Sequence, residues 1–260
     1  KKKNITTHHI DGIIFFIPER GFYDGINNYE MNYFSVKNKH YINQFKKFNK
    51  IPKILFLNDF WHNNKYDWEL CVKQYKITDI FSMYVPFHTS EENFDKYFSF
   101  KATPKFHKIY RSINLKNLSS KKKSIKKKRN FDITLLGAVG NFYPFRKNSI
   151  KLIQSDKSIK FFYKKHPGYL FQKHIKEKKI VGKEYYKVLE NSKIAITCST
   201  IYKIPIPKIW EIMSTGAMLM VDKMDKIKNL GLKKNFNFVE VNEQNLLKNI
   251  HYYIDNPLKR

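Results

Sequence analysis

The chain has 260 residues, of which 42% are hydrophobic and 16% aromatic, and its formal net charge is +28. This size and composition suffice to bury the cores of two ordinary domains, which excludes a disordered protein. The charge predicts attraction to polyanions such as nucleic acid, anionic lipid surfaces or phosphorylated glycans. Because lysine is abundant along the whole chain, a bias of the coding sequence explains the charge equally well.

Strand and helix patterns alternate through the first half of the chain. Short apolar runs predict strands at residues 11–18, 53–59, 77–84 and 106–113. Apolar residues at helical spacing predict helices at residues 38–47, 66–76 and 91–98. Alternating elements of these lengths are typical of a parallel sheet with crossover helices, so residues 1–118 are expected to form one α/β domain.

A basic run at residues 119–130, SSKKKSIKKKRN, marks the clearest boundary. It shows no apolar periodicity, and like charges repel one another into an extended, solvated segment. We interpret the run as an interdomain linker. A clamp for an anionic surface is compatible with this interpretation, and a nuclear-localisation signal stays open.

The strand and helix pattern restarts after the basic run. Strands are predicted at residues 131–137, 159–164, 193–197, 217–221 and 236–241. Helices are predicted from about residue 147, at residues 183–192, and at residues 243–254 behind an N-cap at Asn242. Between them, Pro205 and Pro207 can open a helix that Gly216 ends. Residues 131–260 are therefore expected to form a second α/β domain.

Candidate binding residues follow the predicted strands. Gly137 leaves room for the backbone to approach a ligand at the carboxyl end of its strand, where open α/β sheets bind their ligands. Ser199 and Thr200 precede a helix, where their hydroxyl groups can touch a phosphate or, as the better interpretation, cap that helix. Glu211 lies one turn inside this helix, and its carboxylate is suited to accept hydrogen bonds from hydroxyl groups.

The stretch at residues 203–222, KIPIPKIWEIMSTGAMLMVD, resembles the nucleotide-sugar-binding signature of the group-1 glycosyltransferases. These enzymes have the GT-B fold, and their spore-maturation-like branch is the most similar. Lys208, Glu211, Gly216 and residues 217–222 match its basic residue, Glu, Gly step and buried strand. The resemblance implies that Glu211 holds the ribose hydroxyls of a donor nucleotide. The fuller pattern has a second Glu eight positions earlier, where this chain has Lys203.

Two more segments resemble the same branch. Tyr143-Pro144 and Arg146, after the strand that ends at Gly137, resemble the opening of its second domain, and Lys164-Lys165-His166 resembles a strand end near the donor diphosphate. The resemblance implies that these basic groups stabilise a diphosphate leaving group. The donor-binding residues are therefore expected to be Gly137, Asn141, Arg146, Lys165, His166, Ser199, Thr200, Lys208 and Glu211.

The chain lacks the sequence motifs of common metal and phosphate sites. It has no Asp-x-Asp, no Gly-rich phosphate loop with Lys-Ser/Thr, no His-Glu-x-x-His and no Cys-x-x-Cys. We therefore predict a reaction without a metal and without a cofactor besides the nucleotide-sugar donor. In the first domain, Asp59 and His62 are candidates for a general base near the acceptor, with helix capping or a surface pair as the alternative.

Cysteine usage and the apolar runs bear on the compartment. Cys71 and Cys198 are far apart and in no metal-type spacing, so free thiols in a reducing compartment are expected. No apolar run approaches the roughly 18 to 20 residues of a membrane span, and the start does not resemble a signal peptide. We expect a cytoplasmic protein that can lie peripherally on an anionic membrane. Because an initiator methionine is absent, we also expect a truncated N-terminal domain.

Together these patterns predict two Rossmann-like α/β domains that face a cleft, as in the GT-B fold. Residues 1–118 are the acceptor-side domain, residues 119–130 the linker and residues 131–260 the donor-binding domain. The predicted function is a metal-independent glycosyltransferase, hexosyl- or related, with a nucleotide sugar and a glycan, lipid-linked or protein acceptor as partners. The alternatives are a nucleic-acid-binding protein, which the dispersed charge disfavours, and a degenerate transferase that serves as a binding module.

Overall fold

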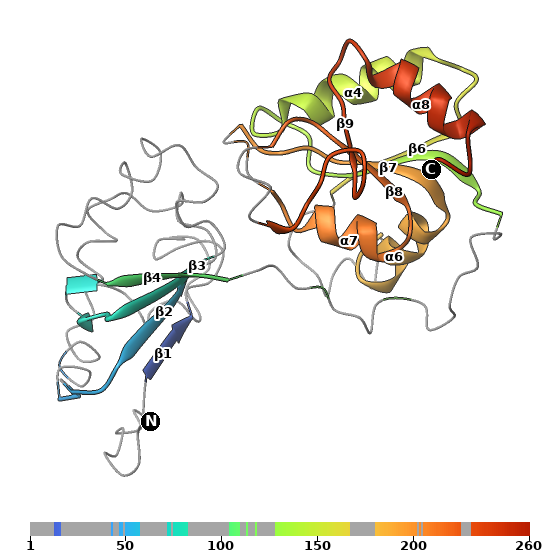
Figure 1. The fold of residues 1–260 in the computed structure, drawn as a ribbon. Coiled ribbons are helices and arrows are strands. Elements are labelled where there is room, and N and C mark those ends of the chain that lie inside the picture. The colour runs from blue at the N-terminus through green and yellow to red at the C-terminus, as the bar shows by residue number, and fades with distance from the viewer. Residues whose placement is uncertain are drawn as a thin grey trace. The chain divides into compact units, whose positions relative to one another are not determined.

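The structure, a computed structural model, describes residues 13–16, 43, 47–48, 50–57, 72–73, 75–82, 104–109, 113, 118, 128–166, 180–201, 203, 205–224 and 230–260. The chain divides into two compact units, Lys1–Tyr110 and Arg111–Arg260 (Figure 1). None of the helices in the described ranges combines the length and the apolar character that crossing a membrane requires.

The first unit contains a four-stranded parallel sheet whose spatial order, β1-β2-β3-β4, follows the chain. Leu55 and Ile80 are fully buried in its central strands. Each strand overlaps a predicted one, which confirms the parallel α/β pattern. Most residues of the three predicted helices lie outside the described residues. The strands are β1 Ile13–Phe16, β2 Lys53–Leu57, β3 Asp79–Ser82 and β4 Lys105–Lys108.

The second unit is built on a five-stranded parallel sheet with the order β6-β5-β7-β8-β9. The chain starts in β5, adds β6 on one side and returns to add β7 on the other side, so the strand order reverses between β5 and β7. Open α/β sheets bind ligands outside the carboxyl ends of their strands at such a reversal. The strands are β5 Phe131–Gly137, β6 Phe161–Lys165, β7 Ser192–Ile196, β8 Met218–Val221 and β9 Val239–Glu240.

Helices cover both faces of this sheet (Figure 1). The apolar face with Ile133 and Leu135 packs with the residues of α4 and α8, and the opposite face with Leu136 and Leu219 packs with those of α6 and α7. Burial on both faces explains why the β8 sequence is apolar without alternation. The helices are α4 Pro144–Ser155, α6 Lys183–Glu190, α7 Lys208–Ser214 and α8 Leu246–Asp255.

Two helix starts differ from the prediction. Helix α4 begins at Pro144, before the predicted residue 147, because proline at the first helical positions has the required φ and lacks an N–H that the helix would leave unpaired. Helix α8 begins at Leu246 instead of residue 243. Asn242 and Asn245 form a turn there, in which each side-chain oxygen accepts the other's backbone N–H at 2.9 Å.

The end of the basic run belongs to the second unit. Arg129 donates to the carbonyl oxygens of Glu190 at 3.2 Å, Ser192 at 2.8 Å and Thr215 at 3.4 Å. Burial lowers the pKa of its guanidinium, with a smaller contribution from Arg260. Arg129 therefore contacts the second unit although it lies within the predicted linker, and most of the basic run lies outside the described residues.

Candidate functional site

Gly137 ends β5 at the reversal of strand order. Its φ of +140° is a conformation that residues with a side chain rarely adopt. A Cβ built there would lie 2.8 Å from Arg146 Nη1 and 2.9 Å from Lys208 Cε. The glycine therefore lets two cationic side chains lie against the backbone at the carboxyl end of β5.

Arg146 is a buried cation in the first turn of α4, with 1% of its surface exposed. Its Nη1 donates to the Ala138 carbonyl at 2.6 Å, its Nη2 donates to Thr197 Oγ1 at 3.2 Å, and its guanidinium lies 4.5 Å from the Tyr143 ring centroid. Within the described ranges it has no carboxylate at ion-pair distance, and its Nε is buried without a partner. A buried cation without a counter-charge is costly, which makes this position favourable for an anion.

Tyr185, Lys208 and Glu211 form a chain of polar contacts between α6 and α7. The Tyr185 hydroxyl donates to Glu211 Oε2 at 2.8 Å, and Lys208 Nζ donates to the same hydroxyl at 3.3 Å. Lys208 Nζ also lies 4.5 Å from the Tyr185 ring centroid. Tyr185 is a site residue that the sequence does not indicate, because nothing in a helical aromatic pair distinguishes a core ring from one that orients a carboxylate.

Burial is the largest cause of the pKa shifts of Lys208 and Tyr185. It lowers the pKa of Lys208 to about 8, against an opposing effect of Glu211, and the charge of Arg146 lowers it further. Burial and the neighbouring Glu211 raise the pKa of Tyr185 well above its usual value, so its phenol stays neutral at pH 7. The Lys208 ammonium is therefore a positive charge held in a poorly solvated position, where its electrostatic interactions are stronger than in water.

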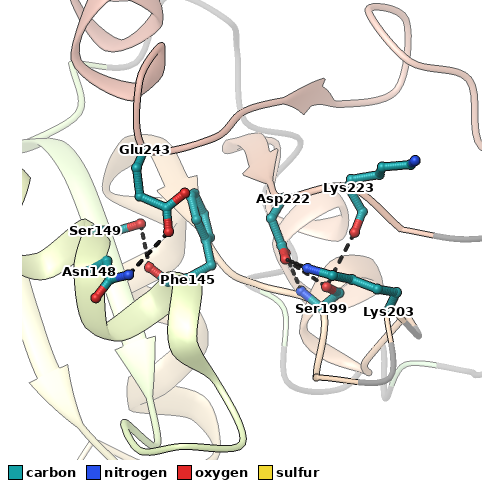
Figure 2. A network of polar contacts seen from close by, with 8 residues as sticks. All are labelled: Phe145, Asn148, Ser149, Ser199, Lys203, Asp222, Lys223 and Glu243. Atoms are coloured by element: carbon teal, nitrogen blue, oxygen red, sulfur yellow. Dashed lines mark hydrogen bonds and ion pairs between the residues drawn. The ribbon is translucent and has the colours of Figure 1, made fainter.

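Asp222 organises a second group of contacts beyond the end of β8 (Figure 2). The Ser199 hydroxyl donates to Asp222 Oδ2 at 2.7 Å, the Ser199 backbone N–H donates to Oδ1, and Lys203 Nζ donates to Oδ2 at 3.1 Å. Helix α7 is preceded by Pro207 and has no side-chain cap, so the expectation that Ser199 or Thr200 caps it is wrong. The buried Asp222 carboxylate accepts the hydrogen bond of the Ser199 hydroxyl instead.

The structure brings some predicted residues together and separates others. Gly137, Arg146, Lys208 and Glu211 are linked through contacts at the end of β5 and the start of α7. Lys165 is exposed and pairs in register with Gly137, and the His166 backbone N–H donates to the Gly137 carbonyl at 3.1 Å. Of the remaining predicted residues, Thr200 is buried, Asn141 is exposed in a turn, and Asp59 and His62 lie outside the described residues.

Neither thiol nor metal chemistry is indicated in the described part of the chain. It contains no group of three or more His, Cys, Asp or Glu side chains that could hold a metal ion. Cys198 is a free, buried thiol, and burial raises its pKa to about 11. A thiol with this pKa is protonated at neutral pH and therefore a poor nucleophile.

Substitution of Gly137 is expected to damage both fold and site. The Gly137→Ala change places a methyl group against Arg146 and Lys208 in a strained φ, so we expect a loss of about 1–3 kcal/mol in the free energy of unfolding. Denaturant titration measures it. Gly140→Ala is the matched control, because a Cβ there meets nothing within 4 Å. Equal stability of the two variants would contradict the close approach of the two cations.

No protein-family model and no curated protein sequence matches the chain. Solved structures with a similar fold do. An alpha-glucosyltransferase in complex with UDP-glucose and DNA containing an abasic site superposes with a TM-score of 0.60 at 11% identity, over 96% of this chain and 73% of that one. The Anabaena protein HepE in complex with UDP and glucose gives 0.54 at 12% identity, over 84% of this chain and 68% of HepE.

HepE in complex with UDP-glucose gives a similar TM-score of 0.52 at 12% identity, with the same coverage. Identities this low establish the fold alone. They agree with two parallel α/β units, one of which reverses its strand order as Rossmann-like sheets do. The chain therefore has the fold of the GT-B glycosyltransferases.

Proposed function

We propose that this protein is a glycosyltransferase that transfers a sugar from a nucleotide-sugar donor, which its second unit binds. The observation that carries the proposal is the pair of poorly solvated cations, Arg146 and Lys208, at the reversal of strand order. The UDP-glucose and UDP complexes of similar fold support this assignment of a ligand class.

The arrangement suits a nucleoside diphosphate in both charge and hydrogen bonding. Lys208 faces a diphosphate as a fixed positive charge, and Arg146 positions the loop after β5 through the Ala138 carbonyl. The Glu211 carboxylate, oriented by the Tyr185 hydroxyl, accepts hydrogen bonds from ribose hydroxyls. Lys165 and His166 add donors beside Gly137, and Asn141, Ser199 and Thr200 complete the proposed donor side.

Fixed cations can supply what a divalent metal supplies in other transferases. The leaving diphosphate gains negative charge as the glycosidic bond breaks, and preorganised positive groups stabilise that charge without reorganisation. We propose a metal-independent reaction on this basis. In the first unit, Asp59 or His62 would accept the proton of the acceptor hydroxyl if the reaction inverts the anomeric centre.

The net charge of +28 favours an anionic acceptor or surface as a second element of the function. The alpha-glucosyltransferase of similar fold was solved with DNA, so nucleic acid is a candidate acceptor beside a glycan, a lipid-linked sugar or a protein. An electrostatic acceptor contact is salt-dependent, whereas a neutral glycan contact is not. Transfer to duplex DNA and to neutral glycans, each measured at several salt concentrations, separates these acceptors.

The proposed function is tested by ligand-induced stabilisation and turnover of the full chain. UDP, ADP, GDP and UDP-glucose are added without metal, and one nucleotide is expected to stabilise the fold by about 2.7 kcal/mol at a hundredfold excess over its Kd. Release of nucleoside diphosphate from the matching nucleotide sugar is then followed. Stabilisation by a nucleotide without release of nucleoside diphosphate would favour a binding module over an enzyme. Salt-sensitive binding of duplex DNA without any response to nucleotides would contradict the proposal.

A further inference from the structure

A cavity of about 370 Å³ lies in the second unit, beyond the carboxyl ends of β8 and β9. Small-molecule sites have volumes of roughly 300–1,000 Å³, so it is large enough for a small ligand. Its walls come from the first residues of α4, the segment after β8 and the turn before α8. None of the residues that link Gly137, Arg146, Lys208 and Glu211 lines this cavity. It is therefore distinct from the two cations of the proposed donor site.

The charged side chains of the cavity balance one another. Three lysines and three carboxylates line it, namely Lys203, Lys223, Lys234, Asp222, Glu240 and Glu243. Most are paired within the protein: Lys203 with Asp222 at 3.1 Å, and Lys234 with Glu240 at 2.9 Å. Across the space from Asp222, Glu243 Oε1 accepts from the Asn148 side-chain amide at 3.2 Å (Figure 2). A cavity with balanced charge selects neither an anion nor a cation.

Several hydrogen-bonding groups at the cavity remain available. Glu243 Oε2, Lys223 Nζ and the Asn245 side-chain nitrogen form no hydrogen bond or ion pair with another described residue. They offer one strong acceptor and two donors. A hydroxyl group both donates and accepts, so a ligand with several hydroxyls satisfies such a set, whereas an apolar ligand leaves it unpaired.

From this balance of charge and polarity we infer that the cavity binds a neutral carbohydrate ring. The inference rests on the proposed function, in which the donor carries a sugar and a glycan acceptor would carry another. Either the transferred sugar of the donor or a sugar of a glycan acceptor supplies the same chemistry. The Lys203–Asp222 pair forms one wall and Glu243 forms the opposite wall, so hydroxyls of one ring can bond to both.

Saturation-transfer NMR on the full chain tests this inference. The probes are UDP, UDP-glucose, glucose, N-acetylglucosamine, maltose and inorganic phosphate. At least one saccharide-bearing probe is expected to bind, and Glu243→Ala is expected to weaken it about tenfold, which corresponds to loss of a hydrogen bond to a charged group. The affinity for UDP should stay unchanged. Glu184→Ala is the matched control, because Glu184 is an exposed residue of α6 that pairs only with Lys187 at 2.5 Å among the described side chains.

A second variant tests the same cavity in case the Glu243→Ala chain does not fold. Lys223→Ala changes an exposed side chain and is expected to weaken the same probe, with Lys187→Ala as its control. Weaker binding of UDP-glucose without weaker binding of UDP assigns the cavity to the donor sugar. Weaker binding of free saccharide alone assigns it to an acceptor. Saccharide binding that depends on Glu243 in a chain that does not bind UDP supports the cavity and contradicts the proposed function.

Three results overturn the inference. They are the absence of binding by every saccharide-bearing probe, displacement of the bound saccharide by inorganic phosphate, and equal affinities in the Glu243→Ala and Glu184→Ala chains.

Discussion

A chain with the substitution Glu211→Gln is expected to bind UDP about ten- to a hundredfold more weakly than the unmodified chain, because a hydrogen bond to a charged group contributes about 1.5–3 kcal/mol. The amide keeps the shape of the side chain and removes its charge. It also leaves a single side-chain oxygen. Because the Tyr185 hydroxyl donates to Oε2 at 2.8 Å in the unmodified chain, either Tyr185 or the ribose hydroxyls lose an acceptor. Isothermal titration with UDP measures the effect.

Two companion variants separate the carboxylate from the fold. Glu184→Gln removes an exposed carboxylate from α6 and should leave the Kd for UDP unchanged. Tyr185→Phe keeps the ring beside Lys208 but removes the hydroxyl that orients Glu211, so an intermediate loss of affinity is expected. An unchanged Kd in Glu211→Gln would show that the nucleotide binds elsewhere on the chain.

Lys208→Met is expected to raise the stability of the free protein at pH 7 while it weakens UDP binding about tenfold or more. The pKa of Lys208 in the fold is about 8, below its usual value near 10.5, because burial disfavours the charged form. The charged amine is therefore a cost to folding below pH 8. Methionine fills the same space without this cost, but it offers no charge to a diphosphate.

The stabilisation expected from Lys208→Met should decrease as the pH rises. Between about pH 8 and pH 10.5 the unfolded chain binds a proton at Lys208 that the folded chain has lost, so the cost of the buried charge is relieved as the pH rises. The stability difference between Lys208→Met and the unmodified chain should shrink across this range. Urea titrations at pH 7, 8, 9 and 10 measure it, with Lys187→Met as an exposed control. A difference that stays constant with pH would contradict the desolvation of the Lys208 amine.

Much of the second unit could be predicted from sequence because each strand is a short apolar run between polar turns. The predicted β5 agrees residue for residue with the observed strand, and β8 differs by one residue. The starts of α4 and α8 were predicted less well, because a proline or an asparagine turn decides where a helix begins. The prediction of domain boundaries at residues 118 and 130 stays a prediction.

The candidate site was predictable in its residue types but not in its contacts. The resemblance to the group-1 glycosyltransferases implied that Gly137, Arg146, Lys208 and Glu211 bind a donor nucleotide. Tyr185 was missed, since only the fold brings α6 beside α7. Ser199 was wrongly expected to cap a helix, because Asp222, which accepts the hydrogen bond of its hydroxyl, lies 23 residues further along the chain. A local sequence pattern does not indicate a hydrogen-bond partner that is so distant in the chain.

The three carbonyl contacts of Arg129 determine where the second unit can be separated from the first. They lie at the ends of α6 and α7 and at the start of β7, where carbonyl oxygens favour a positive charge. A fragment that starts at Phe131 would expose these oxygens to water and lose a side chain that ties two helices to one strand. Any separately expressed second unit should therefore begin upstream of Arg129.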